Sequence, residues 1–436
     1  MAAIRLQVAL DFLELSRAMK IAASAVAGGA DIIEAGTPLI KSEGLDAVRQ
    51  LRAAFPDKTI VADMKTMDAG RIEAEAAAKA GANVMTVCGT AGETTIRECV
   101  EAGRHYGLQV AVDLLGVADP AAFAARAEEL GVAWLDVHCA IDEQMQGRDP
   151  LDGLRRVRAA TKLTVAVAGG LNSETAAAAS AAGADVVIVG GAITKAEDVQ
   201  AAAADIRKAI DTRQAVASEQ FKRVTAENIA DILAASRTAN ISGGWHNQPC
   251  LEGLRPLIAG KVVIGRAVTV RTLPGDWSKP VQAIDLAQPG DIIVVDAGGR
   301  SPAIWGELAT ESALTRGVAA LVVEGGVRDT ADIRKRDFPV WARLIVSHAG
   351  EPKGHGEINQ PITICGQRIC PGDWIVADDD GVMVLPAARA VEMANRAADV
   401  LEAENRIRTE IREGSTLAKV ANLQRWEKKG GGIDAG

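Results

Sequence analysis

The chain has 436 residues, which at roughly 100–200 residues per domain predicts two or three domains. Apolar residues make up 48% of it and charged residues 24%, an ordinary globular composition, and with one tyrosine the core must rely on Ala, Val, Ile and Leu. A formal net charge of -9 argues against a protein that coats nucleic acid, which normally carries a basic face, but it allows a local pocket for one phosphate.

The cysteines and the N-terminus indicate a cytoplasmic protein. No two cysteines form a C-x-x-C pair, and in a chain of this length they are typical of reduced thiols. A zinc site made from His355, Cys365 and Cys370 is disfavoured because their spacing matches no zinc pattern. The chain starts without the features of a signal peptide, and no apolar run reaches the about 20 residues that span a bilayer. We therefore expect neither a membrane nor a nucleic-acid partner.

Residues 1–211 repeat one pattern eight times, a short apolar run followed by an Ala-rich amphipathic stretch. The runs are rich in Val, Ile and Leu and do not alternate with polar residues, as expected for parallel strands buried on both faces. They are Leu6–Asp11, Asp31–Gly36, Thr59–Lys65, Asn83–Gly89, Gln109–Gly116, Trp134–Ala140, Leu163–Gly170 and Asp185–Gly191. Stretches such as 70–80 and 120–131 have helical periodicity, and several end in glycine. Eight strand–helix units in this length predict a (β/α)8 TIM barrel of the α/β class.

After residue 211 the pattern changes, and we expect a polar linker or joining helix over 212–225. The remainder, 226–436, is predicted to be a compact α/β domain with a mixed sheet, followed by a charged helix over 387–414 and a frayed end at 430–432. Its expected helices are Ala226–Ser236 and Ser301–Arg316, and its expected strands are Val262–Arg271, Asp291–Asp296, Ala319–Glu324, Ile362–Ile364 and Trp374–Ala377.

Charged and glycine residues gather at the C-terminal ends of the barrel strands, where TIM barrels carry their reacting groups. They are Asp11, Glu34, Asp63, Lys65, Asp113, His138, Gly169, Gly170, Gly190 and Gly191. Any one of these carboxylates could be an ordinary surface-loop residue, and the histidine could be a satisfied structural one. The whole set together is hard to explain in a barrel without chemistry.

Each of these residues has a plausible role. Glu34 and Asp63, on neighbouring strands, suit a hard cation such as Mg²⁺. Lys65 lies two residues after Asp63, so both point into the barrel mouth on a regular strand. His138 is the natural proton-transfer group because its pKa lies near neutrality. The glycine pairs after strands seven and eight expose backbone N–H groups where many barrels hold a phosphate.

The run Asp63-Met64-Lys65-Thr66-Met67-Asp68 is the D-x-K-x-x-D signature of the orotidine-monophosphate-decarboxylase suprafamily. Within it, "LQVALDF", "DIIEAGTPLI", "ADMKTMDAG", "VHCAIDEQ", "VAVAGGL" and "VIVGGAITKA" resemble the 3-hexulose-6-phosphate synthases along residues 5–211. The 3-keto-L-gulonate-6-phosphate decarboxylases are a related alternative. Those normally carry an Arg, an Arg and a Thr where this chain has Ile141, Gly191 and Ala168, so the departures favour the synthases.

The resemblance implies a reversible aldol reaction of ribulose 5-phosphate with formaldehyde that depends on Mg²⁺ or Mn²⁺. Glu34 and Asp63 would hold the metal, His138 would remove a C1 proton, and Lys65 would help to stabilise the enediolate. Asp11 is expected to act in catalysis and substrate binding, and Asp68 would cross a dimer interface into the partner's site.

The second domain contains an acid followed twenty residues later by Arg-Asp, namely Glu307 and Arg328-Asp329. Arginine suits bidentate capture of a carboxylate, the adjacent Asp can hold a hydrated metal, and Glu307 could orient a water. A turn salt bridge capped by glycines is an equally good explanation of the Arg-Asp pair alone.

Residues 226–415 resemble the RraA-like family, which includes 4-hydroxy-4-methyl-2-oxoglutarate aldolases, through "GRAVTV", "QPGDIIVVDAGG", "WGELAT", "RGVAALVVEGGVRD", "PVWAR" and "CPGDWIVADDDGVMVLP". The resemblance implies that Arg328 binds a 2-oxo acid, Asp329 holds a second metal, and backbone amides from Gly306 to Leu308 bind an enolate. Glu307 stands where the aldolases have Asp, which puts aldolase or decarboxylase activity in doubt. A non-catalytic domain for regulation or assembly stays the alternative. The family implies a dimer through the barrel and a trimer through this domain, which would combine into a hexamer.

Overall fold

The computed structural model describes residues 3–218, 221–224 and 228–421. Contacts within the chain divide it into two compact units. The first holds residues 1–144 and 148–223 with the segment that begins at Glu402, and the second holds 145–147 and 224–401. The described residues 402–421 thus group with the barrel, whereas the sequence predicts a single domain over all of 226–436.

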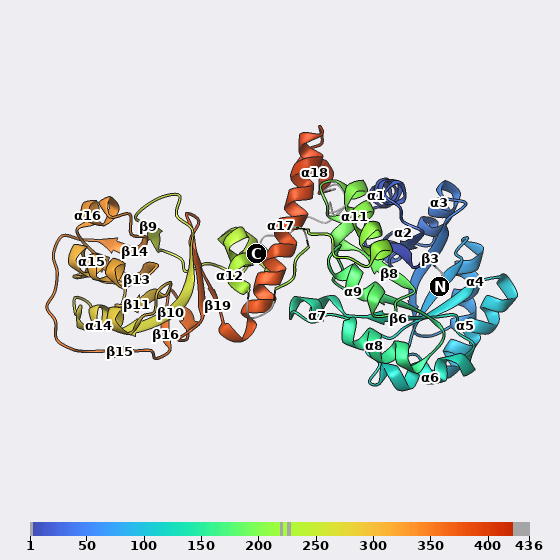
Figure 1. The fold of residues 1–436 in the computed structure, drawn as a ribbon. Coiled ribbons are helices and arrows are strands. Elements are labelled where there is room, and N and C mark those ends of the chain that lie inside the picture. Colours follow the sequence, from blue (N-terminus) through green and yellow to red (C-terminus); the bar gives the residue numbers. More distant parts are fainter. Residues whose placement is uncertain (1–2, 219–220, 225–227, 422–436) are drawn as a thin grey trace, which may run out of the picture. The chain divides into compact units, whose positions relative to one another are not determined.

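The first unit is a closed barrel of eight parallel strands in chain order, in which β1 also pairs with β8 (Figure 1). Its strands are β1 (Arg5–Leu10), β2 (Ile32–Ala35), β3 (Thr59–Thr66), β4 (Val84–Cys88), β5 (Gln109–Asp113), β6 (Trp134–His138), β7 (Thr164–Ala168) and β8 (Val186–Val189). Each predicted run overlaps one of these strands, and only β1 and β3 extend beyond their runs, by one residue each, so the expected barrel is confirmed.

Helices surround this barrel, because each strand is followed by an amphipathic stretch that buries alanines and aliphatic residues against it. They are α1 (Leu15–Ala27), α2 (Thr37–Glu43), α3 (Asp46–Ala54), α4 (Gly70–Lys79), α5 (Glu93–Tyr106), α6 (Pro120–Leu130), α7 (Ile141–Met145), α8 (Leu151–Ala160), α9 (Thr175–Ala181), α10 (Gly191–Thr194) and α11 (Val199–Thr212). A separate core of inward-pointing residues, including Ile32, Val61 and Trp134, fills the barrel interior.

The second unit is built on a mixed sheet with strand order β19-β18-β10-β11-β13-β14-β9, with β12 beside β13 and β15 beside β10. Its strands are β9 (Arg255–Pro256), β10 (Val263–Arg271), β11 (Ile292–Asp296), β12 (Ala303–Trp305), β13 (Ala320–Val327), β14 (Val340–Ile345), β15 (Glu357–Ile358), β18 (Trp374–Ala377) and β19 (Val382–Leu385), and a separate hairpin is formed by β16 (Ile362–Ile364) and β17 (Gln367–Ile369). Two buried clusters lie on the sheet, one with α14–α16 and one with the hairpin. The expected compact mixed-sheet domain is therefore confirmed.

The remaining helices are α12 (Ile229–Ala235), α13 (Thr238–Gly244), α14 (Ser278–Leu286), α15 (Glu307–Thr315), α16 (Thr330–Lys335), the 3-10 turn η1 (Ala387–Arg389), α17 (Ala390–Arg412) and α18 (Leu417–Val420). The predicted helix 301–316 is wrong in its first part. Residues 303–305 form β12, because a short apolar run between Pro302 and Gly306 pairs in parallel with β13, and the helix begins only at Glu307.

Two other expectations concern the segments around the second unit. The described residues of 213–224 form neither helix nor strand, and the predicted frayed glycines at 430–432 lie outside the described residues. The charged helix expected over 387–414 is present as η1 and α17. No helix in the described part of the chain is long and apolar enough to cross a membrane.

Candidate functional site

Strand ends β3, β5 and β6 bring one lysine, two carboxylates and one histidine into a single network in the barrel mouth. Lys65 Nζ lies 2.9 Å from Asp63 Oδ2 and 2.8 Å from Asp113 Oδ2. The same Asp113 oxygen lies 3.0 Å from His138 Nδ1. Asp113 and Asp63 are buried, whereas the side chains of Lys65 and His138 are about a quarter exposed, which leaves them accessible from the mouth.

Asp113 decides the charge state of this network. Burial by itself would raise the pKa of Asp113, but the hydrogen bond from His138 and the Lys65 ammonium outweigh it and hold this pKa well below its ordinary value. Burial likewise opposes the charge on Lys65, but Asp63 and Asp113 raise the pKa of Lys65 well above its usual range. Because an ionised Asp113 can only accept, Nδ1 of His138 must carry the proton, which leaves Nε2 as the basic nitrogen.

Lys65 is presented by a bulge in β3. The pairing of β3 with β4 shifts between Ala62 and Thr66, and Lys65 adopts a left-handed backbone conformation with φ 44°. Bulges of this kind re-aim a side chain, and a non-glycine residue with positive φ marks stored strain. Asp63 and Lys65 do meet in the mouth as predicted, but through this irregularity and not through the pleat of a regular strand.

A second group of carboxylates lies beside this network. Glu34 is 8% exposed and accepts a hydrogen bond from Gln7 Nε2 at 2.7 Å. Burial first, then the carboxylates of Asp63 and Asp11, raises the pKa of Glu34 well above its ordinary value. Burial, and then the carboxylate of Asp63, also raises the pKa of Asp11. Asp136, on β6, has its pKa raised by burial and then by Asp113 and Asp63.

The carboxylates at this end of the barrel are of the type that binds hard cations. Within residues 3–218, 221–224 and 228–421, no three His, Cys, Asp or Glu side chains are grouped as a metal site. Mg²⁺ nevertheless keeps several waters and needs only one or two carboxylates. Glu34 and Asp63 are buried next to each other with Asp11 nearby, and their mutual repulsion is the condition that a divalent cation relieves. The donor set therefore fits a hard cation held by two carboxylates and water.

The glycine pairs lie where the strands of the barrel require small residues. Gly169 has φ 113°, and a Cβ there would stand 2.5 Å from the Cys139 carbonyl oxygen. Gly190 lies beside Asp11, since its Cβ position is 3.8 Å from Asp11 Oδ2. At Gly191 a Cβ would meet the ring of Phe221 at 2.1 Å. The expected phosphate loops thus flank the carboxylates at the same end of the barrel.

The site contains Asp113, for which the sequence predicted no specific role, and Asp136, which it did not single out. Asp113 was only one of several strand-end carboxylates, yet it joins Lys65 to His138. Asp136 lies two residues before His138, so a period of two could have placed it on the same face. Asp68 lies apart from the network: it is exposed, and its Oδ1 accepts a hydrogen bond from the Ala69 amide at 2.7 Å.

In the second unit the Glu307, Arg328 and Asp329 motif is brought together at one end of β12 and β13. Asp329 Oδ2 accepts a hydrogen bond from the Glu307 amide at 3.2 Å and lies 3.5 Å from Arg328 Nε. A Cβ at Gly306 would stand 2.5 Å from Asp329 Oδ2, so the close approach requires glycine. Leu308, next along the chain, is 78% exposed.

The carboxylate of Glu307 is held by a residue that the sequence did not predict. Arg336, at the end of α16, makes ion pairs with Glu307 and with Glu311. An ion pair of this kind fixes the direction of the Glu307 carboxylate, and it also competes with a role of Glu307 as a base. Arg336 lies one short helix after the Arg-Asp motif. No sequence motif assigns a role to a residue at that spacing, so the sequence did not predict it.

Comparison with known proteins agrees with both parts of this architecture. Residues 4–206 match the model of the Orotidine 5'-phosphate decarboxylase / HUMPS family, and residues 229–384 match the RraA-like model, described as Aldolase/RraA. The 3-hexulose-6-phosphate synthase of Mycobacterium gastri is 43% identical over 206 residues, which cover 47% of this chain and 99% of that protein. The synthase of Methylomonas aminofaciens is 41% identical over 201 residues, which cover 46% and 96%.

A crystal structure of 3-hexulose-6-phosphate synthase from Salmonella typhimurium is 39% identical, with a TM-score of 0.47, and covers 48% of this chain and 100% of that one. The synthases of Mycobacterium gastri and Methylomonas aminofaciens match the barrel, and the RraA-like match covers most of the remainder. Through residues 4–206 the chain therefore belongs to the orotidine 5'-phosphate decarboxylase / HUMPS family, with 3-hexulose-6-phosphate synthases as its relatives, and it carries an RraA-like domain over residues 229–384.

Proposed function

We propose that the barrel catalyses the reversible aldol addition of formaldehyde to D-ribulose 5-phosphate, which gives a hexulose 6-phosphate. The observation that carries this proposal is the Lys65–Asp113–His138 network, which places an ammonium and a basic imidazole nitrogen side by side at the mouth. Identity of 43% to a named synthase over the full barrel supports the same reaction.

The sugar phosphate is expected to lie across the mouth, with its phosphate at the backbone N–H groups around Gly169–Gly170 and Gly190–Gly191. Its first two carbons would then lie near His138 and Lys65. A divalent cation, Mg²⁺ or Mn²⁺, held by Glu34 and Asp63 would polarise the ketone and stabilise negative charge on its oxygen. Asp11, between the ends of β2 and β8, would accept hydrogen bonds from the sugar hydroxyls.

The reaction then needs a proton to leave C1 and to be returned to the product. His138 Nε2 removes the C1 proton, because Asp113 holds the proton of the other nitrogen in place. Lys65 stabilises the enediolate with its fixed positive charge, since Asp63 and Asp113 keep it protonated. Carbon C1 of the enediolate attacks the formaldehyde carbon, and the ketone at C2 forms again. The formaldehyde oxygen takes the proton held on His138 and becomes the new hydroxyl.

The test is formaldehyde consumption by the purified full chain with ribulose 5-phosphate and Mg²⁺. Asp63→Ala and His138→Ala should each abolish turnover while the protein stays folded, and EDTA should do the same to the wild type. Turnover of 3-keto-L-gulonate 6-phosphate in place of this reaction would support the alternative, a decarboxylase. Asp68→Ala tests the expected dimer: lost activity in a protein that is dimeric by light scattering would support a role for Asp68 in the partner's site.

For the second unit we propose a metal-dependent lyase that acts on a 2-oxo acid, and the specific support is the gathering of Arg328, Asp329 and Glu307 around Gly306. Arg328 would bind the carboxylate, Asp329 would hold a second metal through water, and the amides from Gly306 to Leu308 would face the enolate. Decarboxylation of oxaloacetate with Mg²⁺ is the assay, and Arg328→Ala and Asp329→Ala should abolish it without changing the oligomer. Absence of turnover in the wild type would favour the alternative, a domain for regulation or assembly.

A further inference from the structure

The last part of α17 lies on the barrel through one face of the helix. Glu402, Arg406 and Glu410 are spaced four residues apart and so share that face. The Phe221 amide donates to Glu402 Oε1 at 2.8 Å, the Arg406 guanidinium lies 5.9 Å from the centre of the Phe12 ring, and Arg17 Nη2 lies 2.9 Å from Glu410 Oε2. We call these three residues of α17 the helix clamp.

The helix clamp contacts the barrel at the catalytic ends of two neighbouring strands. Phe12 directly follows Asp11 at the end of β1, and Phe221 covers Gly191, which follows β8. Strands β1 and β8 pair with each other where the barrel closes. The helix clamp therefore lies where β1 and β8 close the barrel, beside the loop that is expected to hold the substrate phosphate.

Phe221 is held in a conformation that it would not adopt unaided. Its φ is 55°, in the left-handed region that a bulky residue rarely enters, and its side chain is 8% exposed. The Arg223 guanidinium lies 4.0 Å from the ring centre and the Lys195 ammonium 5.8 Å, so the ring is also held through cation–π contacts. A strained backbone of this kind persists only where surrounding contacts hold it in place. The hydrogen bond from the Phe221 amide to Glu402 is one of these contacts.

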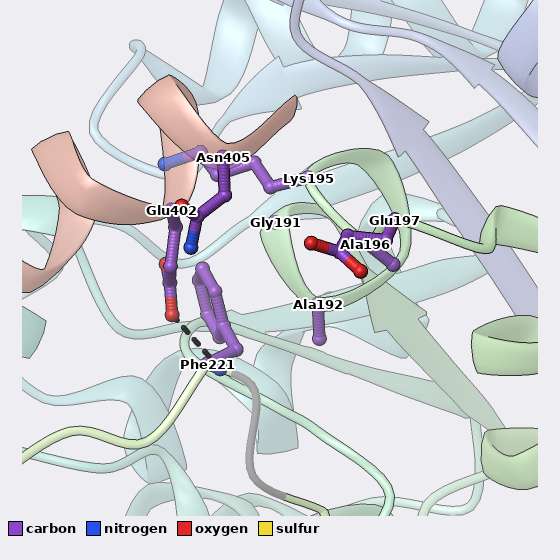
Figure 2. A pocket seen from close by; sticks show the side chains of 8 residues that line it. All are labelled: Gly191, Ala192, Lys195, Ala196, Glu197, Phe221, Glu402 and Asn405. Atoms are coloured by element: carbon purple, nitrogen blue, oxygen red, sulfur yellow. Dashed lines mark hydrogen bonds between the residues drawn. The ribbon is translucent and has the colours of Figure 1, made fainter. Parts of the chain in front are cut away.

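Phe221 and Gly191 form a matched pair. A side chain at position 191 would displace Phe221, because its Cβ would stand 2.1 Å from a Phe221 ring carbon. Figure 2 shows Glu402 and Asn405 of α17 on one side of the resulting pocket and the loop from Gly191 to Glu197 on the other, with Phe221 below. Movement of Phe221 would therefore free the loop after β8.

We propose that Glu402 is a positioning residue of the barrel: by holding Phe221 against Gly191, it fixes the loop that binds the phosphate of ribulose 5-phosphate. This inference rests on the synthase activity proposed above. Phe221 and Glu402 both lie beyond residues 4–206, which match the family model, so the barrel of this chain uses a helix from outside the family's own segment to complete its substrate site.

Glu402→Ala in the full chain tests the proposal. Loss of a charge-assisted acceptor should raise KM for ribulose 5-phosphate about five- to tenfold, with kcat changed less than about twofold. KM for formaldehyde, which has no phosphate, should not change. Glu402→Gln keeps an acceptor oxygen for the Phe221 amide but loses the negative charge 3.7 Å from Arg223, so its KM should stay within about twofold of the wild type. Glu404→Ala is the matched control, because Glu404 pairs with Arg408 on another face of the same helix.

Hydrogen exchange of residues 190–196 gives a readout that does not depend on turnover. Exchange should increase in Glu402→Ala and not in Glu402→Gln or Glu404→Ala. Unchanged exchange would overturn the clamp, and raised exchange with an unchanged KM for ribulose 5-phosphate would overturn its role in phosphate binding. If Glu402→Ala fails to fold, Gly191→Ala displaces Phe221 from the loop side and must produce the same rise in KM.

A further experiment distinguishes failure of the proposed synthase reaction from failure of the proposed role of Glu402. Titration of the wild type with ribulose 5-phosphate in a calorimeter measures binding without turnover. No binding by the wild type would refute the synthase and the phosphate role together, whereas exchange at 190–196 would still decide whether Glu402 holds the loop. Binding weakened in Glu402→Ala alone would support the inference even if the chemical step proves different.

Discussion

Replacing Asp113 with Asn should remove most of the barrel's activity without unfolding it. The side chain is 2% exposed and accepts from Lys65 Nζ at 2.8 Å and from His138 Nδ1 at 3.0 Å. Hydrogen bonds to charged groups contribute about 1.5–3 kcal/mol each. Two such bonds amount to about 3–6 kcal/mol, and because Asn retains one acceptor oxygen we expect the lower part of that range, a loss of about 10²–10³ in kcat.

The chain supplies a matched control for this substitution. Asp136 is the register partner of Asp113 on the next strand and is equally buried, but its pKa is raised where that of Asp113 is lowered. A raised pKa favours the neutral form of Asp136, which Asn mimics, so Asp136→Asn should change kcat by less than about threefold. Formaldehyde consumption at saturating ribulose 5-phosphate measures both. Equal losses in the two variants, or a loss below tenfold in Asp113→Asn, would refute this assignment of charge.

Three further outcomes are expected. In the second unit, burial opposes the charge on Asp276, but hydrogen bonds from Ser278 and from the Lys353 and His355 amides hold the pKa of Asp276 well below its ordinary value of 3.8. This contribution to stability is present above the unfolded pKa and is lost only as pH falls through the folded pKa, which lies well below 3.8. In urea unfolding Asp276→Asn should therefore cost about 1–3 kcal/mol at pH 7, keep most of that cost at pH 3 and cost clearly less near pH 2; an equal cost at pH 7 and pH 2 would contradict it. Burial raises the pKa of the Cys99 thiol to about 12, so iodoacetamide at pH 8 should leave Cys99 unlabelled in the native protein and label it after unfolding. At Gly36 a Cβ would stand 2.2 Å from Asp11 Oδ1, so Gly36→Ala should lower kcat/KM at least about tenfold with circular dichroism unchanged, and full activity would exclude a role for the position of Asp11.

The barrel could be predicted from the sequence because each of its strands is buried on both faces and so appears as an unbroken apolar run. The second unit was harder. Its strands β9, β12, β15 and β17 have only two or three residues, too few for any period to be visible, and β12 was mistaken for the start of a helix. Strands β10 and β11 were found, since they carry the core of that unit, but β14 and β19 were missed although they have six and four residues.

The candidate site could be predicted at the level of its residues but not of its contacts. Strand ends placed Asp63, Lys65 and His138 together because parallel strands end at one edge. The bulge that aims Lys65 has no signal in the residues around it, and the role of Asp113 depends on which two neighbours reach its oxygen. The contact of Glu402 with Phe221 joins residues 181 positions apart, which no local pattern reveals.

The measurement that tests the central claim most directly follows ¹³C-formaldehyde by NMR in the presence of the full chain, ribulose 5-phosphate and Mg²⁺. Because C1 of the sugar attacks the formaldehyde carbon, the label should appear in the hydroxymethyl C1 of a six-carbon sugar phosphate, with His138→Ala as the inactive control. A label that stays in hydrated formaldehyde, in a sample that is folded and supplied with metal, would contradict the account.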